Sequence, residues 1–288
     1  MPKRVAALSD TVIFLFAGEP AQPVGTAFIV GYPVPRLDNA TVPLVVTAKH
    51  VAADHKKLFG RFSTTEGKTT AVLEYDITRL KADGDYWEHP DEGVDIVVFR
   101  SMHPHEAKYE AIPLRFVATR ETFQQEDIGQ ADRIVFPALL VNFLGSARNY
   151  PVLRDGAIAL VPDEKVPLRF NVGSRVISSE QELILLDATS IPGASGSPVF
   201  LWPGPRIKHQ TFTLGGALPY LLGVMHGFYP AAPRELVDIQ TAGVSRMFAE
   251  NSGIAIVFPS WRLREILERP DLKARIDNLA ANEPPEAS

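Results

Sequence analysis

Residues 193–198 of this 288-residue chain read GASGSP and follow Ile191-Pro192. Gly, Ser and Pro in this arrangement predict a tight turn that presents the hydroxyl of Ser195. Glycine at position 193 lets the main chain approach a substrate with no Cβ in the way. The N–H groups of Gly193 and Ser195 are then the expected donors of an oxyanion hole. The same letters also form ordinary turns between strands, so the interpretation depends on the rest of the chain.

Two further segments each combine an apolar strand with one titratable residue. Residues 45–51 read VVTAKHV, where His50 ends a core strand that would hold a general base rigidly. Residues 93–99 read GVDIVVF, where Asp95 starts an otherwise apolar strand. Burying a carboxylate is costly unless a partner pairs with it, and orienting the imidazole of His50 would supply that partner. Taken singly, a structural histidine and a turn aspartate are equally ordinary interpretations.

The order of these three residues along the chain separates the known convergent triads. His50, Asp95 and Ser195 follow the chymotrypsin order. An α/β-hydrolase needs an acid and then a histidine after the serine, but no Asp or Glu lies between Ser195 and His226, the last histidine of the chain. A subtilisin order would need an acid before His50 and alternating strands and helices, a pattern that the sequence lacks.

Several blocks resemble those of the trypsin-like (chymotrypsin-fold) serine peptidase family. The main ones are TAKHV at 47–51, similar to TAxHV, GVDIVVF at 93–99, similar to a DIAVL-type block, and PGASGSPVF at 192–200, similar to PGNSGSPVF. Supporting blocks are GTAFIV at 25–30, LLGVMHG at 221–227 and NSGIAI at 251–256. The DAT at 187–189 is similar to the bacterial HtrA-type and glutamyl-endopeptidase-type branches, here expected without a PDZ domain.

The resemblance implies an all-β fold of two antiparallel six-stranded β-barrels with a C-terminal helix. We expect an N-terminal barrel over 1–112 with the histidine and aspartate, a second barrel over 113–259 with the serine, helices over 260–282 and a disordered tail over 283–288. In the helical region Ser260 is the expected N-cap, and Pro270 is expected to end the first helix.

The implied activity is that of a serine endopeptidase acting through an acyl-enzyme. His50 would take the proton of Ser195, and Asp95 would fix the tautomer of His50 and stabilise its imidazolium form. Ala194 stands where family members carry Asn or Asp, and in digestive members that aspartate pairs with a newly released N-terminus. We therefore expect no activation of that kind. The alternative is a catalytically silent domain of the same fold that binds proteins.

The expected substrate-binding residues are Thr189, Met225, His226 and Gly227, within a pocket built from 186–192 and 222–229. Thr189 lies where trypsin-like members carry an acidic pocket base, so a strong preference for Lys or Arg is not expected. In glutamyl endopeptidases a pocket histidine binds the substrate carboxylate, but here Met225 holds that position. A shift of one residue turns a side chain to the other face of a strand, so His226 can equally contact Asp95.

The composition limits the kinds of partner that we expect the chain to bind. The net charge is −5 and no basic stripe occurs, so no nucleic-acid partner is expected. No apolar run approaches the ~20 residues of a membrane-spanning helix, and we expect no membrane partner. The chain has no cysteine, which suits a reducing cytoplasm, and we expect a cytoplasmic protein; many bacterial exported proteins also lack cysteine, so a secreted or periplasmic location stays open. We expect a protein or peptide substrate, no cofactor and no metal, and we interpret His103-Pro104-His105 as a solvated loop rather than a metal site.

Overall fold

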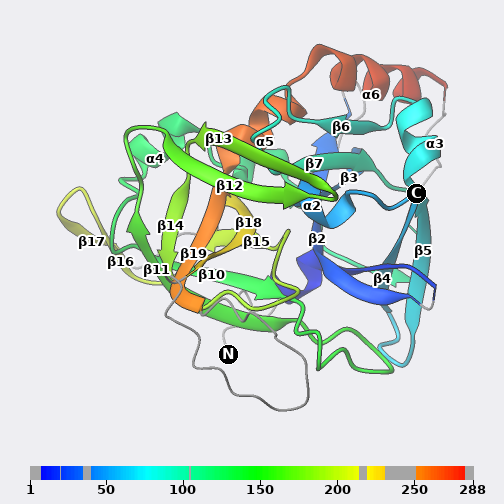
Figure 1. Ribbon diagram of the computed structural model, residues 1–288, viewed down its shortest axis with the longest axis horizontal. Coiled ribbons are helices and arrows are strands. Elements are labelled where there is room, and N and C mark those ends of the chain that lie inside the picture. Colours follow the sequence, from blue (N-terminus) through cyan, green and yellow to red (C-terminus); the bar gives the residue numbers. More distant parts are fainter. Residues whose placement is uncertain are drawn as a thin grey trace.

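The computed structural model describes residues 8–19, 21–34, 40–103, 105–213, 219–230 and 251–282. It is mostly β-structure in two halves, with two helices at the C-terminal end of the described chain (Figure 1). The predicted tail at 283–288 lies outside the described residues, as does part of the loop that follows β2.

The first half is one sheet of nine strands. Its main path runs β5-β4-β1-β2-β3-β7-β6, with β8 paired to β4 and β9 paired to β2. The strands are β1 (Val12–Ala17), β2 (Gln22–Pro33), β3 (Thr41–Thr47), β4 (Lys57–Thr64), β5 (Thr70–Asp76), β6 (Tyr86–Glu88), β7 (Val97–Arg100), β8 (Ala107–Lys108) and β9 (Ile112–Pro113).

This first sheet is a half-barrel and not the closed six-stranded barrel that we expected. Its two outer strands, β5 and β6, do not pair with each other. The chain between them forms helix α3 (Ile77–Ala82), whose N-cap Asp76 accepts a hydrogen bond from the N–H of Arg79. A helix placed between two edge strands keeps their main-chain groups apart, so the sheet stays open.

The second half is a closed barrel of six antiparallel strands, as predicted, in the order β10-β11-β14-β19-β18-β15. These strands are β10 (Arg133–Ala138), β11 (Val152–Leu160), β14 (Ile184–Asp187), β15 (Pro198–Leu201), β18 (Leu221–Pro230) and β19 (Asn251–Pro259). Two hairpins project from this barrel: β12 (Val166–Val172) with β13 (Arg175–Gln181), and β16 (Arg206–Lys208) with β17 (Thr211–Thr213).

Short helical turns join these strands. They are η1 (Leu8–Thr11), α2 (Lys49–Ala52), η2 (Leu114–Phe116) and α4 (Arg120–Gln125). In the chain the last strand of the first sheet is β9, and α4 leads into the second barrel.

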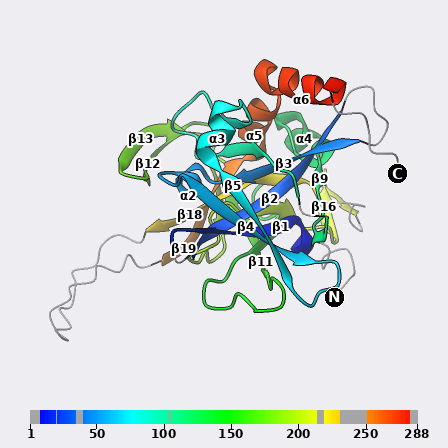
Figure 2. The same ribbon diagram turned by 90° about the vertical axis from the view of Figure 1, so that its right-hand side faces the viewer.

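The C-terminal helices α5 (Ser260–Leu267) and α6 (Pro270–Asn282) lie along one side of the molecule, with α6 above β6 (Figures 1 and 2). Ser260 is not the N-cap that we expected, because it is the first helical residue and its hydroxyl donates to the carbonyl of Ala118 at 2.7 Å. Pro270 opens α6, where its missing N–H costs nothing. On α6, Arg275 bonds the buried carboxylate of Asp85 at 2.8 Å, which ties this helix to the first half.

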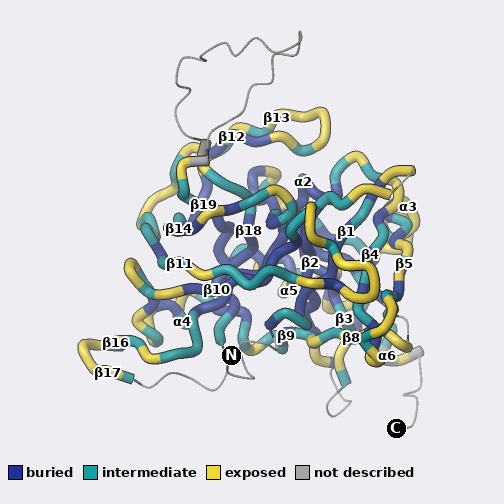
Figure 3. The backbone as a smooth tube through the Cα atoms, turned by 90° about the horizontal axis from the view of Figure 1, so that it is seen from below, coloured by how far each residue is buried: buried dark blue, intermediate teal, exposed yellow. Residues whose placement is uncertain are grey.

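The largest buried cluster spans both halves. It joins Phe28 and Leu44 of the first sheet to Val224 and Phe258 of the second barrel, with Leu263 of α5. Figure 3 shows these buried segments in the middle of the molecule, between β2 and β18. Within the described ranges, every helix is too short or too polar to span a membrane.

Candidate active site

His50 lies in the short helix α2, directly after strand β3, and Asp95 lies in the segment that leads into β7. The predicted strand around Asp95 begins only at Val97, so Asp95 is in a connection. The N–H of His50 donates to Oδ1 of Asp95 at 2.8 Å, and the N–H of Lys49 donates to the carbonyl of Asp95 at 3.3 Å. The start of α2 is therefore held on the segment that carries the aspartate.

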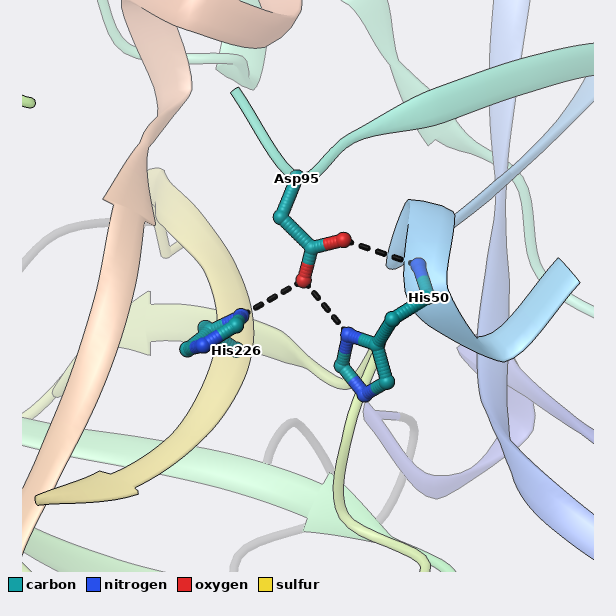
Figure 4. Close-up of side chains that lie close together, drawn as sticks. All are labelled: His50, Asp95 and His226. Atoms are coloured by element: carbon teal, nitrogen blue, oxygen red, sulfur yellow. Dashed lines mark hydrogen bonds and ion pairs between the residues drawn. The ribbon is translucent and has the colours of Figure 1, made fainter. Parts of the chain in front are cut away.

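The side chains of His50 and Asp95 are also joined directly. Nδ1 of His50 lies 2.6 Å from Oδ2 of Asp95 (Figure 4), and Asp95 is only 1% exposed. Because an ionised carboxylate only accepts hydrogen bonds, Nδ1 is the donor and Nε2 keeps the lone pair that a general base needs.

The charges in this pair shift the pKa of both residues. Burial by itself raises the pKa of Asp95, but two neighbouring imidazoles outweigh burial and hold the pKa of the carboxyl well below its usual range. Burial lowers the pKa of His50, yet the charge and the hydrogen bond of Asp95 raise it further, so the net direction is upward. Asp95 therefore stabilises the protonated form of His50.

Ser195 lies on the turn that the sequence predicts. The N–H of Ala194 donates to the carbonyl of Ile191 at 3.0 Å, and Gly193 has φ of +96°. Proline at 192 and glycine at 193 are the residues that a type II turn requires in its two central positions. The side chain of Ala194 is fully buried in the second barrel, so no charged group stands there to pair with a released N-terminus.

Thr26 of strand β2 fastens this turn to the first half. Its N–H donates to the carbonyl of Ser195 at 2.9 Å, and its hydroxyl donates to the carbonyl of Gly193 at 2.7 Å. The same hydroxyl accepts the N–H of Leu139 at 3.0 Å. In the described part of the chain, the N–H groups of Gly193 and Ser195 have no acceptor, as the donors of an oxyanion hole require.

The hydroxyl of Ser195 does not bond His50 in this structure. Oγ donates instead to the main-chain carbonyl of His226 on β18, at 2.9 Å. The structure thus brings His50 and Asp95 into direct contact and places Ser195 on the same cavity, with its hydroxyl turned toward β18.

His226 adds a second imidazole to Asp95. Its Nδ1 lies 2.6 Å from the same Oδ2 that bonds His50 (Figure 4). The ring packs edge-on against Phe170 at 4.9 Å and Phe258 at 5.7 Å between centroids. Of the two positions that the sequence left open for His226, the structure has the contact with Asp95.

These three side chains also have the spacing of a metal site, since their ligand atoms lie within 4.8 Å of one another. The two nitrogen–oxygen distances of 2.6 Å are hydrogen-bond distances. Ligands around one metal ion each lie about 2 Å from it, and so about 3 Å or more from one another. The geometry is that of two histidines bonded to one carboxylate.

A cavity of about 490 Å³ opens beside the serine. Its walls are His50, Phe170, Asn171, Ser190, Ile191, Pro192, Ser195, His226, Gly227 and Phe228. Two of the expected substrate-binding residues, His226 and Gly227, line it. Met225 points into the core of the second barrel because neighbouring strand residues face opposite sides, and Thr189 is exposed away from the cavity.

Phe170 and Asn171 are wall residues that the sequence analysis missed. They come from the β12–β13 hairpin, which reaches across to the first half (Figure 1). The N–H of Ser174 donates to Asp54 at 2.9 Å, and Arg175 pairs with Glu92 at 2.7 Å. The hairpin thus contacts the first half at two points, Asp54 and Glu92.

Three other histidines, His89, His103 and His105, do not line this cavity. His103 is half-buried and stacks on Tyr109 at 4.1 Å, so the expected solvated loop holds only for His105, which is exposed. His89 is buried and its Nε2 bonds Glu265 of α5 at 2.6 Å.

Comparison with solved structures identifies the fold. No family model and no curated protein matches the chain. Among solved structures, the MamO protease domain from Magnetospirillum magneticum (apo form) aligns with a TM-score of 0.51 and 14% identity, over 91% of this chain and 98% of that one. An inactive form of Rv3671c from M. tuberculosis H37Rv, a serine-to-alanine mutant, aligns with a TM-score of 0.45 and 15% identity, over 97% and 91%. The half-barrel, the closed barrel and the C-terminal helices together form the chymotrypsin-like fold of trypsin-like serine proteases.

Proposed function

We propose that this protein is a serine endopeptidase, with Ser195 as nucleophile, His50 as general base and Asp95 as the residue that orients His50. One observation carries the proposal. Asp95 bonds both the main-chain N–H and the ring Nδ1 of His50, which leaves Nε2 as the free ring nitrogen on a cavity that also contains Ser195. This double restraint fixes both the position and the tautomer of the ring, as a general base requires.

The reaction proceeds through an acyl-enzyme. The hydroxyl of Ser195 leaves the carbonyl of His226 by rotation about its Cα–Cβ bond and turns toward His50. As Oγ bonds the substrate carbonyl carbon, its proton passes to Nε2 of His50, and the N–H groups of Gly193 and Ser195 stabilise the oxyanion. Collapse breaks the C–N bond, and His50 returns the proton to the departing amine. A water molecule then repeats both steps and releases the acid.

For the substrate we propose an uncharged P1 side chain. Ile191, Pro192, Phe170 and Phe228 give the cavity apolar walls, and no Asp, Glu, Lys or Arg is among its described lining residues. The two titratable lining residues, His50 and His226, already bond Asp95, so a charged side chain would lose its water there without gaining a free ion-pair partner. The bacterial HtrA-like and glutamyl-endopeptidase-like branch and a cytoplasmic place of action rest on sequence patterns alone, and we retain them as proposals.

A second candidate function is a silent domain that binds proteins without cutting them. The observation that favours it is the hydrogen bond from Ser195 to the carbonyl of His226, because a hydroxyl held there cannot pass its proton to His50. In the absence of substrate, however, catalytic hydrogen bonds often form only on binding.

Labelling with a fluorophosphonate probe separates the two functions. We expect the wild-type chain to be labelled, Ser195→Ala to be unlabelled and His50→Ala to be labelled at least about a hundredfold more slowly, as for loss of a general base. Ser197→Ala is the matched control, since this buried serine lies two residues away and should leave labelling intact. A folded wild-type chain that fails to label would contradict the peptidase and favour the silent domain.

A further inference from the structure

One carboxylate serves two histidines at the centre of the site. The Oδ1 atom of Asp95 accepts the main-chain N–H of His50. Its Oδ2 atom accepts the ring Nδ1–H of His50 and that of His226, both at 2.6 Å. The side chain of Asp95 is fully buried, so its one negative charge lies between two rings that can each carry a proton.

Within the described residues, the contacts of His226 include no other charged group. Phe170 on β12 and Phe258 on β19 give only aromatic edges, and the ring of His50 stands 5.3 Å away at 80°. Among the contacts of the described residues, Asp95 and His50 are therefore the titratable groups that face His226. Its side chain is 11% exposed and that of Asp95 is fully buried, so solvent screens their interaction only weakly.

We propose that His226 is a positioning residue for Asp95, whose hydrogen bond to Oδ2 holds the carboxylate for His50. The hydrogen bond from His226 fixes the carboxylate in the plane that His50 needs. It also withdraws charge from Oδ2, which makes the imidazolium form of His50 less favourable than it would be with Asp95 alone.

The effect of this hydrogen bond on catalysis rests on the proposed function. His50 accepts the proton of Ser195 only while it is neutral, so activity falls as the pH drops through its pKa. By restraining the rise in that pKa, His226 would keep His50 neutral down to a lower pH.

The test compares two substitutions at position 226. His226→Asn keeps an N–H donor close to the place of Nδ1 but cannot be protonated, and His226→Phe keeps the ring shape without a donor. Each is made in a Ser195→Ala chain, where the ring nitrogens of His50 are followed by NMR titration. This measurement needs no catalytic activity.

We expect the pKa of His50 to rise in His226→Phe by about half a pH unit or more, as for loss of one hydrogen bond to the carboxylate. In His226→Asn it should stay nearer the value found without a substitution at 226. An unchanged pKa in His226→Phe, or equal shifts in both variants, would overturn the proposal. Should His226→Phe fail to fold, the low-field Nδ1 protons decide: two in the chain with His226 and one in His226→Asn support the proposal, and a single one with His226 present overturns it.

Kinetics then extend the test to the active chain. In His226→Phe we expect kcat/KM to fall about tenfold or more, the size of a lost hydrogen bond to a charged group, with the acid limb of its pH profile moved to higher pH. His226→Asn should recover most of the rate. A raised pKa of His50 in His226→Phe, in a chain that never labels with the fluorophosphonate, would refute the peptidase and leave this inference standing. Labelling of the wild type together with an unchanged pKa of His50 in His226→Phe would do the reverse.

Discussion

The two halves of the molecule build their shares of the site in different ways. The first half is an open sheet, and its contribution, His50 and Asp95, is held by hydrogen bonds between charged or chargeable groups. The second half is a closed barrel, and it places Ser195 by main-chain shape, with Gly193 at φ of +96° and Gly196 at φ of +85°. Substitutions that change a charge should therefore affect mainly the part of the site in the first half. Substitutions that change the backbone geometry should affect mainly the part in the second half.

His226 contacts both halves of the molecule. It belongs to β18 of the closed barrel, yet its side chain bonds the carboxylate of the first half and its carbonyl accepts the hydroxyl of Ser195. Thr26 crosses in the other direction, from the open sheet to the turn that carries Ser195. Neither half holds a complete site, so the docking of the halves is itself part of the machinery.

The largest effect should come from changing the charge at Asp95. In Asp95→Asn the amide can present only one oxygen to two rings, so His50 loses the acceptor that fixes its tautomer. We expect kcat/KM on a peptide substrate to fall about 10⁴-fold, as for loss of the carboxylate in other triads. Asp155→Asn is the control, because that carboxylate is 59% exposed on the second half. A fall of less than about tenfold in a folded Asp95→Asn chain would contradict the proposed role.

A second substitution changes the shape of the backbone beside Ser195 and leaves every charge unchanged. A Cβ on Gly196 would lie 2.1 Å from the carbonyl oxygen of Thr26 and 2.3 Å from the hydroxyl of Thr47, at a φ that only glycine adopts freely. We expect Gly196→Ala to lower the free energy of unfolding by about 3–5 kcal/mol, measured by urea denaturation. Gly84→Ala, at φ of +71° with nothing within 4 Å, should cost about 1 kcal/mol. Equal losses in the two variants would show that conformational strain, and not the contact between the halves, sets the cost.

The same division explains what the sequence could predict. The turn at 191–198 and the strand before His50 are local patterns that the structure has, although β3 ends at Thr47 and His50 itself lies in helix α2 instead of at the end of the strand. The closed second barrel was also predicted, whereas the open first sheet was not. Its openness depends on α3 lying between β5 and β6, a tertiary fact that no local pattern contains.

The walls of the cavity show a similar limit. Alternating apolar residues at 166, 168, 170 and 172 would have indicated strand β12 and a shared face for Leu168 and Phe170. The sequence does not say that this face meets His226, since that depends on how the hairpin crosses to the first half. His226 and Met225 are neighbours on β18, so their side chains face opposite sides of the strand. That difference could be predicted from the sequence, but the contact of His226 with Asp95 depends on how the two halves pack.

The smallest expected effect is on pH stability and concerns His103 of the first half. Its ring stacks on Tyr109 and meets the edge of Phe62, and neither ring nitrogen has a partner among the described residues. Burial lowers the pKa of His103 from 6.5 to about 4. Between these values the unfolded chain binds a proton that the folded chain refuses, so stability falls as the pH drops from 6.5 toward 4.

We expect this loss to be about 2 kcal/mol, below the full value of the pKa shift because the ring is partly exposed. His103→Phe should remove it, so that urea midpoints at pH 7 and pH 4 differ less than in the wild type, while the exposed His105→Phe should change nothing. Since Asp95 keeps its charge at pH 4 and its ion pair with a protonated His50 persists there, the site itself does not lose its carboxylate over this range. A His103→Phe chain that is as acid-sensitive as the wild type would assign the loss to other groups and remove this contrast between the aromatic cluster and the His50–Asp95 pair within the first half.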